Sequence, residues 1–144
     1  MSAQLGLFDD APLMADVFER LLPAGTRTVL ADDVLPHNDA ALAVISVVRG
    51  DALVGVVIAR GAEVWAAPLL ANGQLPAAVG RWLMHAPALI GHDLKRQMHG
   101  WRRAGVQPRG VLWDVMIAAH LCGAEMHQLG LSDLISGTWK KPGA

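Results

Sequence analysis

Residues 42–68 read LAVISVVRGDALVGVVIARGAEVWAAP. Two runs rich in β-branched residues, 42–48 and 53–59, flank a short glycine-containing turn, and a second such turn precedes a third run at residues 63–68. Because connections this short join antiparallel neighbours, the stretch predicts a three-strand antiparallel meander. The unbroken apolar character of residues 42–48 further predicts a strand that is buried on both faces of its sheet.

Outside the meander, the apolar residues change to the spacing of amphipathic helices. This spacing predicts helices at residues 13–22, 75–84, 93–104, 114–122 and 131–135. Short apolar runs predict further strands at residues 26–30, 88–91 and 111–112. A meander followed by alternating helices and short strands predicts an α/β fold, a mixed sheet with helices packed on it.

The length of 144 residues fits one domain, which we place at residues 13–139 between short tails at residues 1–12 and 140–144. A content of 53% hydrophobic and 17% charged residues excludes wholesale disorder. The longest apolar run is too short for a membrane-spanning helix, and no signal segment opens the sequence, so we expect a cytoplasmic protein. With a net charge of −1, the chain as a whole is not a general electrostatic binder of nucleic acid.

The second half of the chain resembles a known family. Residues 89–112 read LIGHDLKRQMHGWRRAGVQPRGVL, residues 113–121 read WDVMIAAHL and residues 131–139 read LSDLISGTW. In order and spacing, these segments resemble the 3′→5′ exonuclease domain of family A (polymerase I type) DNA polymerases. That family has a Gly-x-Asn-x-Lys-Tyr/Phe-Asp segment, then a Phe-Asp-Thr-x-Leu-Ala-x-Tyr-Leu helix and a Leu-x-x-Leu helix. The resemblance covers residues 42–139 and implies a ribonuclease-H-like fold.

The family hydrolyses phosphodiesters with two divalent ions, which four carboxylates hold. The resemblance puts Ser46 and Val48 at the Asp-x-Glu of the first motif, and Gln97 at the Asp of the second. The third motif, Tyr-x-x-x-Asp, has no counterpart, because the sequence contains no tyrosine and ends before the corresponding helix. The resemblance therefore implies a degenerate, catalytically inactive domain without a metal cofactor. Its expected role is that of a structural or interaction module in DNA replication or repair.

Two alternatives remain open. In the first, the chain is an active 3′→5′ exonuclease whose Mg²⁺ ions are held by displaced ligands, namely Asp51, Asp93 and Asp114. In the second, it is an unrelated α/β binding module. Asp114 matches a family acid that is not a metal ligand, and it is placed to cap the helix after it. Asp93 is likewise placed as the N-cap of the helix that begins there.

The N-terminal tail carries the pentapeptide QLGLF at residues 4–8. It resembles the bacterial sliding-clamp-binding motif Gln-Leu-(Ser/Asp)-Leu-Phe. The resemblance implies that Leu5, Leu7 and Phe8 fill an apolar groove on the clamp while Gln4 hydrogen-bonds at its edge. The alternative is a tail that docks on the domain's own surface, or a remnant of an interdomain linker.

Positive charge gathers between residues 95 and 109, most densely at Lys95, Arg96, Arg102 and Arg103. Such a cluster predicts a weak, salt-dependent contact with DNA phosphates, and its alternative is a solvated helix face.

Other chemistry-bearing residues give no site. The six histidines lack cysteine or glutamate at ligand spacing, so we expect no metal site. Cys122 has no neighbouring base in the sequence and is expected to be a buried, inert thiol. The five tryptophans are expected to pack in the core. The lack of the last family helix would expose apolar surface, which leaves self-association and the oligomeric state open.

Overall fold

The structure, a computed structural model, describes residues 22 and 24–136. The predicted clamp-binding pentapeptide and nearly all of the predicted first helix lie outside the described residues. In chain order the elements are β1 (Arg27–Thr28), β2 (Leu42–Arg49), β3 (Ala52–Arg60), β4 (Glu63–Pro68), α3 (Ala77–His85), β5 (Ala88–Gly91), α4 (Leu94–Arg103), β6 (Val111–Asp114), α5 (Val115–Leu121), the 3₁₀ helix η1 (Met126–Gln128) and α6 (Leu131–Ser136).

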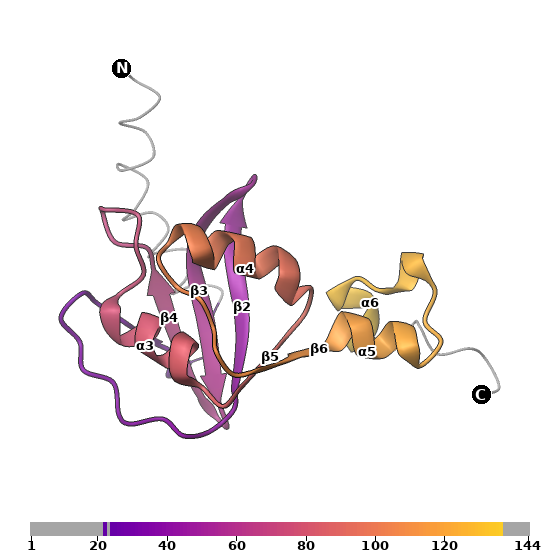
Figure 1. Ribbon diagram of the computed structural model, residues 1–144, viewed down its shortest axis with the longest axis horizontal. Helices are drawn as coiled ribbons and strands as arrows, with labels where there is room; N and C mark the ends of the chain where they lie inside the picture. The colour runs from indigo at the N-terminus through magenta and orange to yellow at the C-terminus, as the bar shows by residue number, and fades with distance from the viewer. Residues whose placement is uncertain (1–21, 23, 137–144) are drawn as a thin grey trace, which may run out of the picture.

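The strands form one six-stranded mixed sheet in the order β1-β4-β3-β2-β5-β6 (Figure 1). β2, β3 and β4 pair antiparallel, as the meander predicts, with a register shift between Val47 and Val48 on β2. β5 pairs parallel with both β2 and β6, and β1 pairs parallel with β4. The predicted α/β fold class with a mixed sheet is confirmed, and the sheet is consistent with a ribonuclease-H-like fold.

One face of the sheet builds the main core. On this face, Leu42, Ile58 and Trp65 are almost completely buried. Both α3 and α4 pack on the same face, as Leu83 and Trp101 are fully buried in the same apolar cluster (Figure 1). The indole rings of Trp65 on β4 and Trp82 on α3 meet edge to face, with their centroids 4.8 Å apart. Helices α3 and α4 therefore cover the core face of the meander.

The opposite face of the sheet is open in the part of the chain that the structure describes. Ile45 on β2 is 45% exposed. Ile90 on β5, whose pairing partner on β2 is Ala43, is 38% exposed. The expectation that residues 42–48 are buried on both faces is therefore wrong. The physical reason is that α3 and α4 both return to one face, which leaves the β-branched residues of the other face without a described covering helix.

The C-terminal helices form a small lobe beside the sheet (Figure 1). Ala119, Ala124 and Leu129 make an apolar cluster of their own, separate from the main core. Two expectations fail in this region, since Cys122 is exposed rather than buried and Trp113 is 63% exposed rather than packed in the core. Trp113 lies on the edge strand β6 and Cys122 at the end of α5, and the lobe is too small to enclose them. No helix among the described residues is long and apolar enough to cross a membrane.

Candidate functional site: the cleft between the meander and helix α4

Ser46, Gln97 and Trp101 form a hydrogen-bonded network where β2 meets α4. The backbone N–H and the Oγ of Ser46 both donate to Oε1 of Gln97, each over 2.9 Å. Nε1 of Trp101 donates to Oγ of Ser46 over 2.8 Å. Nε2 of Gln97 donates to the carbonyl oxygen of His92 over 2.7 Å. Gln97 and Trp101 are four residues apart, so α4 presents both side chains on the face that it turns toward β2.

Every polar group of this network is neutral, and each has a partner. Ser46 and Gln97, for which the resemblance predicts the first and second motif positions, are in direct contact although 51 positions separate them. The side-chain oxygen of Gln97 already accepts two hydrogen bonds, and its side-chain nitrogen can only donate. The network therefore offers no anionic oxygen to a divalent ion, which binds carboxylates by preference. Val48 lies beyond the register shift and is 53% exposed. It lines a cleft that Ser46 and Gln97 also line.

A cleft of about 700 Å³ opens above this network. One wall is the β2–β3 hairpin, with Asp51 in its turn and Leu53 on β3, and the other is α4. Arg96 and Arg103 line the helical wall, and His99 lies between them in the sequence. The cleft therefore has a neutral floor and a cationic wall, and its volume falls in the range of small-ligand sites.

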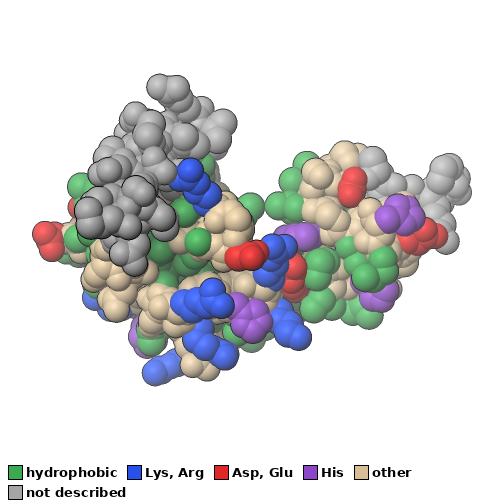
Figure 2. All heavy atoms as spheres, turned by 90° about the horizontal axis from the view of Figure 1, so that it is seen from above, with side chains coloured by type: hydrophobic (Ala, Val, Ile, Leu, Met, Phe, Trp, Pro, Cys, Tyr) green, Lys and Arg blue, Asp and Glu red, His purple; other side chains and the backbone are tan. Residues whose placement is uncertain are grey.

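The other side of α4 faces a second cleft of about 320 Å³. Lys95 and Arg102 line it, above an apolar base that includes Met98 and Leu112. The two cations at each cleft are seven residues apart, which is about two helical turns. Each pair therefore lies on one side of α4. Figure 2, which views the molecule from the top of Figure 1, shows blue Lys and Arg side chains gathered over this region. The sequence-predicted cations thus come together as one basic ridge between two clefts.

All four cations of the ridge are exposed. Among the described residues, the ion pair of Arg60 with Glu63 and the contact of His127 with Glu125 both lie elsewhere. The positive charge of the ridge is therefore available to an anion from solvent.

Asp114 joins the sheet to two helices. Its Oδ1 accepts from the backbone N–H of Asp93 and of Met116, over 3.0 and 2.9 Å, and its Oδ2 accepts from the N–H of Leu94 over 2.8 Å. The expectation that Asp114 caps the helix after it is confirmed. The same carboxylate also satisfies the first amides of α4, where its negative charge complements the helix dipole.

Asp93 occupies the N-cap position of α4, but its side chain makes no capping hydrogen bond. The expectation that it caps the helix is thus wrong in mechanism. Its backbone is left-handed, with φ 52° and ψ 56°, a conformation that Asp and Asn adopt more readily than other residues with a Cβ. The turn that this conformation makes delivers the Asp93 amide to Asp114, and the chemistry of the cap comes from Asp114 alone.

The three carboxylates proposed as displaced metal ligands do not gather at one point. Asp93 and Asp114 are adjacent, whereas Asp51 lines the cleft on the opposite side of α4 from Asp114. Across residues 22 and 24–136, no three His, Cys, Asp or Glu side chains lie close enough to share a metal ion. Asp114 also commits both carboxylate oxygens to backbone amides.

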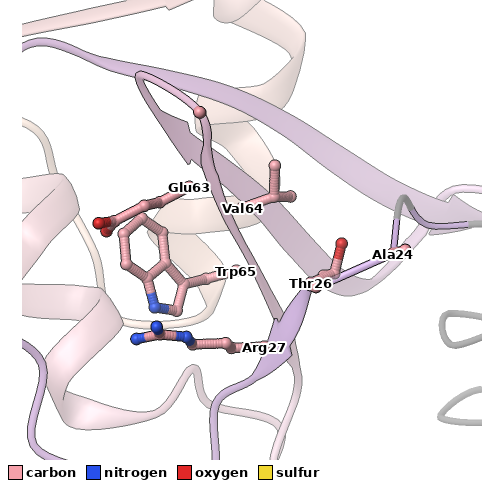
Figure 3. A pocket seen from close by; sticks show the side chains of 8 residues that line it. Ala24, Thr26, Arg27, Glu63, Val64 and Trp65 are labelled. Carbon is pink, nitrogen blue, oxygen red and sulfur yellow. The ribbon is translucent and has the colours of Figure 1, made fainter.

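A third, smaller pocket of about 170 Å³ lies between β1 and β4. Figure 3 shows Arg27, Glu63 and Trp65 among its lining residues. Arg60, from the end of β3, holds its guanidinium 5.3 Å from the Trp65 ring centroid and pairs with Glu63 over 3.1 Å. This pocket is smaller than typical ligand sites, so the cleft along α4 is the stronger candidate.

Neither the models of known protein families nor the curated proteins give a match to this chain. The assignment of the cleft therefore depends on its own residues. Sequence reasoning identified Ser46, Val48, Gln97 and the four cations but missed Trp101, which completes the network. The spacing of four between Gln97 and Trp101 is the signal that could have found it.

Proposed function

We propose that this chain is a catalytically inactive 3′→5′ exonuclease-like module, related to that domain of family A DNA polymerases. It serves as a structural or interaction module in DNA replication or repair. The observation that supports the proposal is the contact between Ser46 and Gln97, because it joins the two positions at which the resemblance expects metal-binding carboxylates. A neutral, saturated network stands where hydrolysis by that family needs anionic oxygens.

A metal-binding experiment tests whether these positions correspond. The double variant Ser46→Asp/Gln97→Asp puts two carboxylates within reach of one ion. Mn²⁺ at about ten times its Kd is expected to raise the Tm of this variant by about 5 °C, because ligand binding to the folded state stabilises it. The isosteric variant Ser46→Asn/Gln97→Asn is the matched control and is expected to show no shift.

Wild-type protein is expected to show no Mn²⁺-dependent shift and to leave end-labelled single-stranded DNA intact in Mg²⁺ or Mn²⁺. Degradation by the wild type that is lost in Asp51→Asn would overturn the proposal in favour of displaced ligands. An unchanged Tm in the dicarboxylate variant would refute the correspondence of Ser46 and Gln97 with the metal positions.

The basic ridge of α4 is the element of the module that we propose contacts DNA, through Lys95, Arg96, Arg102 and Arg103. The double variant Arg96→Glu/Arg103→Glu is expected to weaken binding of a single-stranded oligonucleotide at least about tenfold in fluorescence anisotropy. The slope of log K against log salt is expected to fall by about 1.4, which corresponds to two lost phosphate contacts.

The control is Arg27→Glu/Arg81→Glu, which changes the net charge equally at two exposed arginines outside α4. It is expected to retain nearly the wild-type affinity. Equal loss in both variants would mean that only the overall charge matters and that α4 is not the contact.

The N-terminal pentapeptide is proposed to tether the module to a sliding clamp. Calorimetry with a bacterial clamp is expected to give a micromolar Kd, since burial of Leu5, Leu7 and Phe8 is offset by the translational and rotational freedom lost on association. The variant Leu7→Ala/Phe8→Ala is expected to abolish binding, and Asp9→Ala/Asp10→Ala, just outside the pentapeptide, to preserve it. Absence of wild-type binding at about 100 µM would remove the tether from the proposal.

A further inference from the structure

Strand β6 ends the sheet, and its side chains are unusually apolar for such a position. In the described part of the chain it pairs with β5 alone. Val111, Leu112 and Trp113 are 57%, 39% and 63% exposed. Edge strands are usually protected by charged residues, proline or bulges, because unpaired backbone groups template pairing with another chain. β6 carries none of these protections along its three apolar positions.

The backbone of β6 presents its free hydrogen-bonding groups at Leu112. The N–H of Val111 donates to the carbonyl oxygen of Pro87 over 3.0 Å, on the β5 side. Bonding groups alternate sides along a parallel ladder, so the N–H and C=O of Leu112 point away from β5. A strand arriving antiparallel at this edge could exchange both hydrogen bonds with Leu112.

The side chains of β6 are complementary to themselves. In an antiparallel pair centred on Leu112, Val111 of each copy lies opposite Trp113 of the other. Aromatic and β-branched residues make favourable cross-strand pairs, and this register forms two of them on one face.

We propose that β6 is a dimerisation edge, at which two copies of this chain pair antiparallel through Val111, Leu112 and Trp113 into one continuous twelve-stranded sheet. The interface is isologous, as two-fold dimers require, because the same strand serves both copies. The net charge of −1 imposes little repulsion between them. This proposal is independent of the proposed function, since it uses neither the cleft nor the basic ridge.

Sedimentation velocity of the full chain at about 1 to 100 µM tests the dimer. The wild type is expected to shift from monomer to dimer across this range. Val111→Glu, which sets a carboxylate against Trp113 of the other copy, is expected to raise the dimer Kd at least about tenfold. Trp113→Ala is expected to weaken the dimer in the same direction, because it removes the aromatic member of both cross-strand pairs.

The matched control is Val34→Glu, the same change at a valine that is 91% exposed in the loop before β2. It is expected to dimerise like the wild type. Circular dichroism melting of each variant checks that the monomer is folded. A wild type that stays monomeric at about 100 µM overturns the proposal, and so does a folded Val111→Glu variant that dimerises as well as Val34→Glu.

Discussion

Replacing Gly110 by alanine is expected to destabilise the protein by about 3 kcal/mol, the upper range for forcing an extra methyl group into a packed site. A Cβ at this position would lie 2.1 Å from the carbonyl oxygen of Ala86 and 2.8 Å from that of Pro87. Both contacts are with backbone, so no side chain can rotate away. The flanking residues hold the strand in place, since the N–H groups of Arg109 and Val111 donate to Met84 and Pro87.

Urea denaturation followed by circular dichroism measures this loss, and Gly100→Ala is the matched control. Gly100 lies within α4, and the nearest atom to an added Cβ there is 3.4 Å away. The same chemical change is therefore expected to stabilise the protein by about 0.5–1 kcal/mol, through the higher helix propensity of alanine. Equal stability of the Gly110→Ala variant and the wild type would contradict the close approach of Gly110, which precedes β6, to the residues that follow α3.

Replacing Asp114 by alanine is the second large effect, with an expected loss of about 2–4 kcal/mol. One carboxylate accepts three backbone amides and caps both α4 and α5, and each lost cap costs about 1–2 kcal/mol. Asp114→Asn is expected to fall between alanine and the wild type. It keeps an oxygen for Asp93 and Met116 but puts an NH₂ group against the N–H of Leu94.

The control for Asp114 is its neighbour in space, Asp93. The Asp93 side chain makes no capping bond and its left-handed backbone suits asparagine, so Asp93→Asn is expected to change stability by less than about 0.5 kcal/mol. The free energy of unfolding from urea titration measures both. A larger loss for Asp93→Asn than for Asp114→Asn would reverse the roles that we assign to the two acids.

Much of the fold could be predicted because turns and periodicity are local. The predicted strands at residues 63–68 and 88–91 coincide with β4 and β5, since a glycine turn or a helix end delimits each of them. The predicted 26–30 strand shrinks to Arg27–Thr28, and the predicted 111–112 strand extends to Asp114. Edge strands have one partner, so their limits depend on a neighbour that local sequence does not specify.

Burial was harder to predict than secondary structure. The sequence of β2 predicts a strand that is buried on both faces, yet Ile45 is exposed. Burial of each face depends on where α3 and α4 pack, which the sequence of β2 does not specify. Trp113 and Cys122 fail for the same reason. Hydrophobicity indicates whether burial of a side chain is favourable, whereas its actual burial depends on whether another element packs over it.

The candidate site could likewise be predicted from the sequence only in part. The resemblance matched Ser46 to the first family motif and Gln97 to the second. Their contact is long-range geometry that spacing alone could not give. The separation of the ridge into Arg96 with Arg103 and Lys95 with Arg102 follows from helical periodicity. The clefts themselves need the packing of α4 against the sheet, which only the folded chain supplies.

The separate apolar cluster of the C-terminal lobe has a consequence for how the molecule opens. Ala119, Ala124 and Leu129 share few apolar neighbours, whereas the main core unites the meander with two helices. Units with small cores open at lower free energy than the whole molecule. We therefore expect the lobe to behave as a separate cooperative unit, one that unfolds and refolds while the sheet stays intact. Such partial opening breaks the hydrogen bond between His92 and the Leu129 carbonyl but leaves the Ser46–Gln97–Trp101 network formed.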